Sequence, residues 1–205
     1  MTTAISKKSG KGVTDGVISE MAGFWDVLPG HEEELAAATQ RMAEAVRGLD
    51  PETSIKTGLR DTRHVIFDDG RRLLWATTFE TEWDAYVDDA VLLIGMGVFL
   101  DWLQHTVQGQ DIVSWARESG ADKFAKGDPE WEALMKQATA QLKAVLQSVQ
   151  RPASAYFNAL SALTLPQFTQ EQRLEKAFQQ VLDDPAAAEA LQHPALKPLL
   201  ELAAD

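Results

Sequence analysis

The histidines are the side chains in this sequence best suited to proton transfer. His31 follows a Pro-Gly turn, His64 lies in a β-rich run, His105 closes an apolar helical stretch and His193 precedes a proline. No two have the spacing of metal ligands, and no His-Glu-x-x-His motif occurs. His64 is therefore a candidate acid/base in a pocket, with a hydrogen-bonded core or interface histidine as the more frequent role of such a residue.

Three further side chains complete the candidate site. Arg63 precedes His64, Trp75 lies on the expected partner strand, and Tyr156 lies in a later short β-rich run. We predict that His64, Arg63 and Tyr156 are catalytic in a pocket between sheet and helices. Trp75 is expected to line this pocket and, with His105, to bind the cofactor if the protein has one. The carboxylate pairs Asp68-Asp69 and Asp88-Asp89 do not form a site, because adjacent side chains on a helix diverge by about 100°.

Composition excludes several classes of protein. The chain has 205 residues, 45% of them apolar, which suffices for one substantial core. Its net charge of −12 opposes phosphate binding, so nucleic acid is not an expected partner. There is no cysteine, which excludes disulfides and thiolate ligands and fits a cytoplasmic protein.

The N-terminal residues are expected to lack fixed structure, and no segment is expected to cross a membrane. Residues 1–15 are rich in glycine, serine and lysine and are expected to form a disordered tail. The longest apolar run, Ala90 to Leu100, is about half the ~20 residues needed to span a bilayer, so no membrane span is expected.

A strand–helix–hairpin unit must position the candidate residues. A strand is expected over residues 16–27, a helix from Glu32 to Arg47, and two strands joined at Asp68-Asp69-Gly70. Both faces of these strands are partly apolar, which predicts that something covers the second face of the sheet. Thr81, with Asp84 three residues on, resembles a capping box that starts the next helix.

The glycines at 95 and 97 interrupt this apolar helix. Each costs about 1 kcal/mol of helix stability, so a break or kink is expected there. One explanation is a kink that leaves room for an apolar ligand, with His64 or His105 as the nearby polar group. Close approach of another helix is an equally weighted alternative.

The second half of the chain is mostly helical. Residues 107–150 form an insertion with a short helix at Asp111 to Arg117 and a long helix after Asp128-Pro129-Glu130, whose apolar stripe includes Trp131 and Met135. Ala153 to Leu160 is predicted to be a strand. Residues 164–205 form helices whose apolar stripe, through Leu174 and Phe178, is expected to pack on the same core.

This order of elements predicts an α+β fold. It is the split β-α-β pattern of a ferredoxin-like antiparallel sheet over residues 16–163, with inserted helices and a helical extension.

Three segments of the sequence resemble known protein families. FWDVLPGHEEELAAA is similar to the first strand and helix of the dimeric α/β-barrel proteins, in which two ferredoxin-like sheets pack face to face. HVIFDDGRRLLWATTFETEWDAYVDDA and RPASAYFNALSALTLPQF resemble uncharacterised bacterial proteins labelled peroxidase-related. The resemblance implies a homodimer joined through the sheet, and His105 as a possible axial ligand of haem. The Gly-x-x-Asp-Gly motif of dye-decolourising peroxidases is absent.

Two functions are consistent with these observations. The first is a small-molecule oxidoreductase acting on an apolar substrate, with haem or no cofactor. The alternative is a non-catalytic homodimeric protein that binds a ligand or assists another protein. The sequence does not identify the substrate.

Overall fold

A four-stranded antiparallel sheet forms the centre of the protein. The computed structural model describes residues 10, 12–121 and 130–203. The strands are β1 (Thr14–Asp15), β2 (Ile18–Asp26), β3 (Leu59–Phe67) and β4 (Arg72–Phe79), in the spatial order β1-β2-β4-β3. Because β4 lies between β2 and β3 and is antiparallel to both, β2 and β3 run parallel. This is the split β-α-β order, and the α+β prediction is confirmed.

The β3–β4 hairpin turns where the sequence predicted. Asp68, Asp69 and Gly70 have φ values of 56°, 54° and 84°. Aspartate and glycine tolerate this left-handed region better than most other residues do. The Arg71 side chain donates to the backbone and carboxylate oxygens of Asp68, which holds the turn closed.

The first two helices connect β2 to β3. Helix α1 (Glu32–Arg47) has three glutamates in its first turn, where the helix dipole favours negative charge. Helix α2 (Pro51–Thr57) has Asp50 as its N-cap, accepting from the Thr53 amide. Only a turn or loop was expected in this second segment.

Helices α3 (Trp83–Ile94) and α4 (Met96–Leu103) are separated at Gly95, as predicted. The predicted capping box at Thr81 is wrong. The N-cap is Glu82, and the Thr81 hydroxyl is buried without a hydrogen-bond partner among the described residues. The helix therefore begins one residue later than the motif indicated.

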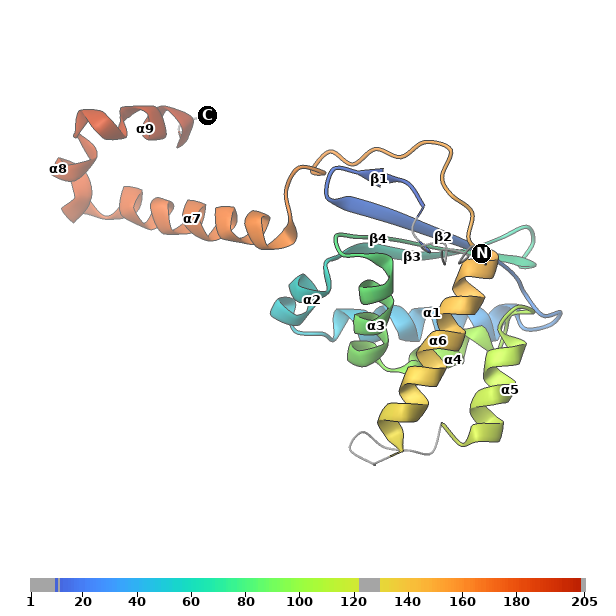
Figure 1. Cartoon of the computed structure of the whole chain (residues 1–205). Coiled ribbons are helices and arrows are strands. Elements are labelled where there is room, and N and C mark those ends of the chain that lie inside the picture. Colours follow the sequence, from blue (N-terminus) through green and yellow to red (C-terminus); the bar gives the residue numbers. More distant parts are fainter. Residues whose placement is uncertain (1–9, 11, 122–129, 204–205) are drawn as a thin grey trace, which may run out of the picture. The chain divides into compact units, whose positions relative to one another are not determined.

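The inserted segment contains α5 (Gln110–Ser119) and α6 (Trp131–Val149). Both helices were expected. The Asp128 and Pro129 part of the predicted start signal lies outside the described residues. Figure 1 shows α1, α3, α4, α5 and α6 on the same side of the sheet. The core lies between this layer and the sheet, and its largest fully buried side chains include Trp25, Trp83 and Trp102.

The predicted strand over Ala153 to Leu160 is wrong. Residues 150–164 form a coil that crosses above the sheet (Figure 1). Its backbone contacts β2 at single points, with Arg151 N donating to Ala22 O at 2.9 Å and Val17 N donating to Ser161 O at 2.8 Å. The fourth strand is instead β1, which pairs with the start of β2. Pro152 has no N–H to donate, which disfavours a continuous ladder in the coil.

Part of the segment expected to be a disordered tail, residues 1–15, forms a strand. Strand β1 lies within residues 1–15, and Gly12 N donates to Glu20 O at 2.7 Å. The side chain of Glu20 also accepts from Val13 N. Residues 1–9 and 11 lie outside the described part of the chain.

Residues 165–205 form a second compact unit. It contains α7 (Leu165–Asp183), two short 3-10 turns (Pro185–Ala187 and Pro194–Leu196), α8 (Ala188–Leu191) and α9 (Lys197–Ala203). Within this unit the predicted apolar stripe of α7 is not covered, since Leu174 is 69% exposed. Docking of this stripe on the main unit stays a prediction. None of the helices in the described ranges is long and apolar enough to cross a bilayer.

Candidate functional site

The predicted catalytic residues lie on opposite faces of the sheet. Successive side chains of a strand alternate between faces, so His64 and Arg63 point in opposite directions. His64 pairs with Trp75 across the β3–β4 ladder on the helix-covered face. Arg63 and Tyr156 line a groove on the other face. The structure therefore brings together two separate pairs and not a three-residue site.

His64 belongs to a packed aromatic cluster. Its ring is stacked on Trp75, with centroids 5.9 Å apart and planes 3° apart, and meets the edge of Trp102 at 5.7 Å. Trp25 packs edge-on against Trp102 at 4.9 Å. We call Trp25, His64, Trp75 and Trp102 the tryptophan cluster. Rings of this kind fill a core and contribute through their edge-to-face geometry.

Burial keeps His64 neutral. It lowers the pKa of His64 from 6.5 to about 4, because the imidazolium would lose its hydration. The Nε2 atom has no accessible surface and no hydrogen-bond partner among the described residues, although the residue as a whole is half-buried. A neutral ring inside a packed aromatic cluster has the position of a core histidine, but among the described residues its Nε2 lacks the hydrogen bond that this alternative assumed. A catalytic role for His64 stays a prediction.

Between the sheet and the helices, Trp75 lines only a small void. The void that Trp75 lines there, bounded by α1, α3, α4 and β3, has a volume of about 30 Å³. One water molecule occupies about 30 Å³ in the liquid. The predicted pocket between sheet and helices is therefore filled by side chains at this position.

His105 lies at the end of α4 and contacts His31. The two Nδ1 atoms are 2.9 Å apart, so one ring donates a hydrogen bond to the other. Burial, and then the neighbouring His31, lower the pKa of His105. A backbone hydrogen bond joins the same two segments, since Leu28 N donates to His105 O at 3.0 Å.

These residues do not fit haem. An axial histidine must face a cavity that encloses the porphyrin, and His105 is absent from the lining of four hollows found among the described residues. Trp75, the second residue predicted to bind a cofactor, packs within the tryptophan cluster. We derive no reaction through haem.

A cavity does lie next to the predicted helix break. Gly95 has φ 89° and ψ 144°, a conformation that ends α3 and that L-residues adopt only with strain. A Cβ atom built on Gly97 would meet no other atom within 4 Å. Close approach of another helix is therefore not the reason for these glycines, and this alternative is wrong.

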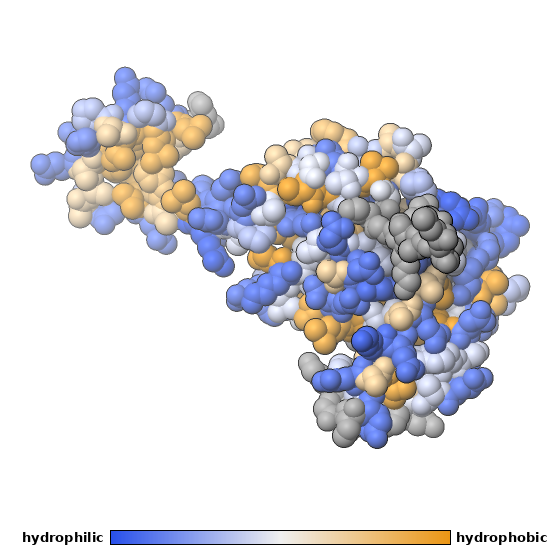
Figure 2. Space-filling model, viewed as in Figure 1, coloured by the Kyte–Doolittle hydropathy of each residue, from blue (hydrophilic) through white to orange (hydrophobic). Residues whose placement is uncertain are grey.

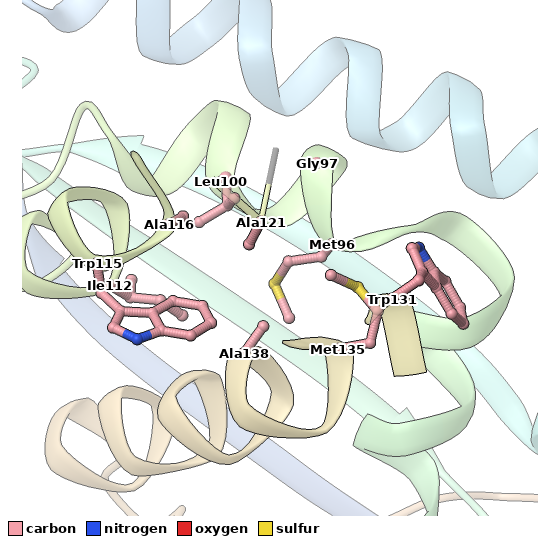
Figure 3. A pocket seen from close by; sticks show the side chains of 10 residues that line it. All are labelled: Met96, Gly97, Leu100, Ile112, Trp115, Ala116, Ala121, Trp131, Met135 and Ala138. Atoms are coloured by element: carbon pink, nitrogen blue, oxygen red, sulfur yellow. The ribbon is translucent and has the colours of Figure 1, made fainter. Parts of the chain in front are cut away.

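The cavity lies between α4, α5 and α6 and has a volume of about 230 Å³. Figure 3 shows the thioether side chains of Met96 and Met135 in its middle, with Trp115 and Trp131 at opposite ends. We call this space the helix cavity. The cavity is partly open, and the residues that line it have small, apolar or aromatic side chains: Met96, Gly97, Leu100, Ile112, Trp115, Ala116, Ala121, Trp131, Met135 and Ala138.

This lining can bind but offers little chemistry. None of these ten side chains titrates near neutral pH, and the only polar side-chain atoms are the indole N–H groups of Trp115 and Trp131. Methionine side chains adapt their shape and make favourable contacts with aromatic rings. Dry apolar cavities of about 150 Å³ already hold benzene. The helix cavity therefore suits an uncharged molecule of about one or two rings.

Sequence reasoning located the break but missed the lining. Neither His64 nor His105, the expected polar groups, lines the cavity. Trp131 and Met135 were assigned to the apolar stripe of α6, which gives no indication that the stripe is incompletely covered. The available signal was the pair of glycines in an otherwise apolar helix.

We compared the chain with known proteins in three ways. A scan against protein-family models, a search of curated proteins and a search of solved structures each found no match.

Proposed function

We propose that this protein is a non-catalytic binding protein for a small, uncharged, apolar molecule, held in the helix cavity. The observation that carries the proposal is the apolar cavity of about 230 Å³ beside the Gly95 break. An ordinary core contains few voids larger than a water molecule. A space of this size, lined by two methionines and two tryptophans, is better explained by a ligand than by imperfect packing.

Binding is favoured over catalysis because of where the titratable groups lie. Acid–base chemistry needs a titratable group within hydrogen-bond reach of the substrate. No such side chain lines the helix cavity. His64 is enclosed by aromatic rings, and Arg63 and Tyr156 lie on the other face of the sheet. The oxidoreductase that the family resemblance implied therefore has no assembled site to support it.

Naphthalene is a suitable probe, because it is neutral, apolar and formed of two fused rings. We expect it to bind the intact chain, to shift the methyl resonances of Met96 and Met135, and to raise the melting temperature progressively as its concentration increases. Substitution Gly97→Leu should abolish these effects, since the new side chain enters the open space. The chain should stay folded, because glycine is the poorer helix former.

Gly48→Leu is the matched control. Gly48 ends α1 with φ −75°, an ordinary helical value, and does not line the helix cavity. Naphthalene binding should be unchanged in this variant. Gly95→Ala is not a useful test, because φ 89° strains any L-residue regardless of a ligand. Failure of naphthalene to bind, or equal binding by Gly97→Leu, would contradict the proposal.

We also propose that the fold is ferredoxin-like and related to the dimeric α/β barrels. The position of β4 between β2 and β3 supports this, while the origin of the fourth strand at the N-terminal side departs from the expected pattern. Homodimerisation through the open sheet face stays a prediction. The coil over residues 150–164 already covers part of that face, and sedimentation at micromolar concentration would test whether a second copy covers more.

A further inference from the structure

The open face of the sheet changes in character from one row of side chains to the next. The register places Phe24, Leu74 and Val65 side by side in one cross-strand row. The next row contains Ala22, Ala76 and Arg63, and the row after it contains Glu20, Thr78 and Asp61. The face therefore passes from apolar, through small residues beside one arginine, to polar.

The small middle row makes a groove. Alanine at both central positions leaves a hollow between the bulkier rows, and the coil closes one side with Arg151 and Tyr156. The volume of this groove is about 400 Å³. Figure 2 shows apolar surface over the coil and β1. Phe157, a residue of the coil, is 82% exposed. We call this space the sheet groove.

The acidic groups of the groove are already engaged. Glu20 is almost fully buried, and its Oε1 accepts from Val13 N at 2.8 Å and Ala153 N at 3.2 Å. Asp61 Oδ2 accepts from the Thr78 hydroxyl at 2.6 Å. The four formal charges of Glu20, Asp61, Arg63 and Arg151 cancel, so the placement of the groups decides which ligand fits.

The basic groups keep donors available. Arg63 is exposed and takes part in none of the ion pairs formed between described residues. Arg151 uses Nη1 on the carbonyl oxygens of Ser148 and Gln150, which leaves its other nitrogens. Tyr156 Oη accepts from Asn158 Nδ2 at 3.4 Å, so the hydroxyl proton is free to donate.

We propose that the sheet groove is a second binding site, distinct from the helix cavity, for a small monocarboxylic acid with an apolar body. Arg63 binds the carboxylate through its guanidinium, which matches a carboxylate with two parallel hydrogen bonds. The apolar body lies over Phe24 and Leu74. Rows on one face of a strand are about 7 Å apart, a distance that an extended chain of about six or seven carbons spans.

Octanoate is the probe, with octanol as its uncharged analogue. Titration calorimetry on the intact chain should show octanoate binding that Arg63→Gln weakens at least tenfold. Ala76→Leu, which fills the groove without changing charge, should weaken it to the same extent. Octanol binding should not change in Arg63→Gln, because octanol has no carboxylate for the guanidinium to bind.

Arg72→Gln and Gly97→Leu are the controls. Arg72 lies on the same sheet face, beyond the apolar row, and its guanidinium is near Asp26 and the Phe67 ring. Neither control should alter octanoate affinity by more than about twofold. The proposal is overturned if octanoate does not bind, if Arg63→Gln binds it as wild type does, or if Gly97→Leu abolishes binding. The last result would place the acid in the helix cavity.

Discussion

The two faces of the sheet are both built mainly from β2, β3 and β4, but they differ in packing. On the helix-covered face, Trp25, Leu73 and Phe79 are fully buried and interlock with the helices. On the open face, apolar, small and charged side chains alternate from row to row, and Val65 remains 42% exposed. A residue's neighbour in sequence is thus in a different environment, since the face changes at every step along a strand.

This difference separates stability from binding. Close packing on the helix-covered face leaves a void of about 30 Å³, whereas the open face retains a groove of about 400 Å³. Substitutions on the covered face should therefore change the free energy of unfolding. Substitutions on the open face should mainly change what the protein binds.

Leu73 and Leu74 give the largest expected contrast. They are adjacent and identical in type, but Leu73 is fully buried under the helices and Leu74 is half-buried in the groove. We expect Leu73→Ala to lower the free energy of unfolding by about 2–5 kcal/mol, through lost burial and the cavity it leaves. Leu74→Ala should cost about 1 kcal/mol. Urea unfolding of both variants measures this, and equal losses would mean that the two faces are equally packed.

The pH dependence of stability should reveal His64. Its pKa is lowered to about 4 in the folded state from about 6.5 in the unfolded chain. The neutral form is favoured by folding, so its contribution is complete above pH 6.5 and is lost as pH falls toward 4. The loss is about 3 kcal/mol by linkage.

The variant His64→Phe isolates this effect. Its free energy of unfolding should fall less steeply than that of wild type between pH 6.5 and pH 4, because the titrating ring is gone. His193→Phe, at an exposed position in the second unit, should follow the wild-type curve. Parallel curves for wild type and His64→Phe would show that the ring is accessible to water in the native state.

Two tyrosines give the smallest contrast. Tyr86 Oη lies 2.8 Å from the hydroxyl of Thr77, which itself donates to Asp61 O, so Tyr86 is the donor. Burial raises the pKa of Tyr86 to about 12. Tyr86→Phe removes this hydrogen bond and should cost about 1 kcal/mol.

Tyr156→Phe provides the comparison on the open face. Its hydroxyl is at the sheet groove, and its partner Asn158 lies in the same coil. We expect no measurable change in the thermal unfolding of this variant. A loss equal to that of Tyr86→Phe would assign Tyr156 a structural role.

Local patterns in the sequence predicted most of the regular structure. The hairpin turn at Asp68 to Gly70, helices α1 and α6 and the break at Gly95 depend on neighbours within a few residues. Turn residues, charges in the first turn and apolar periodicity express such local preferences directly. These predictions are confirmed.

Predictions that depended on distant partners were less successful. Residues 153–160 have the composition of a strand, but β1 takes the place beside β2 and the coil crosses above the sheet. His64 and Arg63 have the chemistry of a catalytic site, but alternation along β3 places them on different faces. Residue types alone do not specify which face of a strand is covered.

The sequence by itself determined an acidic, cysteine-free α+β protein with a split β-α-β core and a broken apolar helix, because composition and local periodicity suffice for those features. Only the tertiary structure decided that the helix cavity stays open beside Gly97 while the space at His64 is filled. Whether a cavity survives depends on the combined volumes of side chains from helices far apart in the chain, and no single segment contains that information.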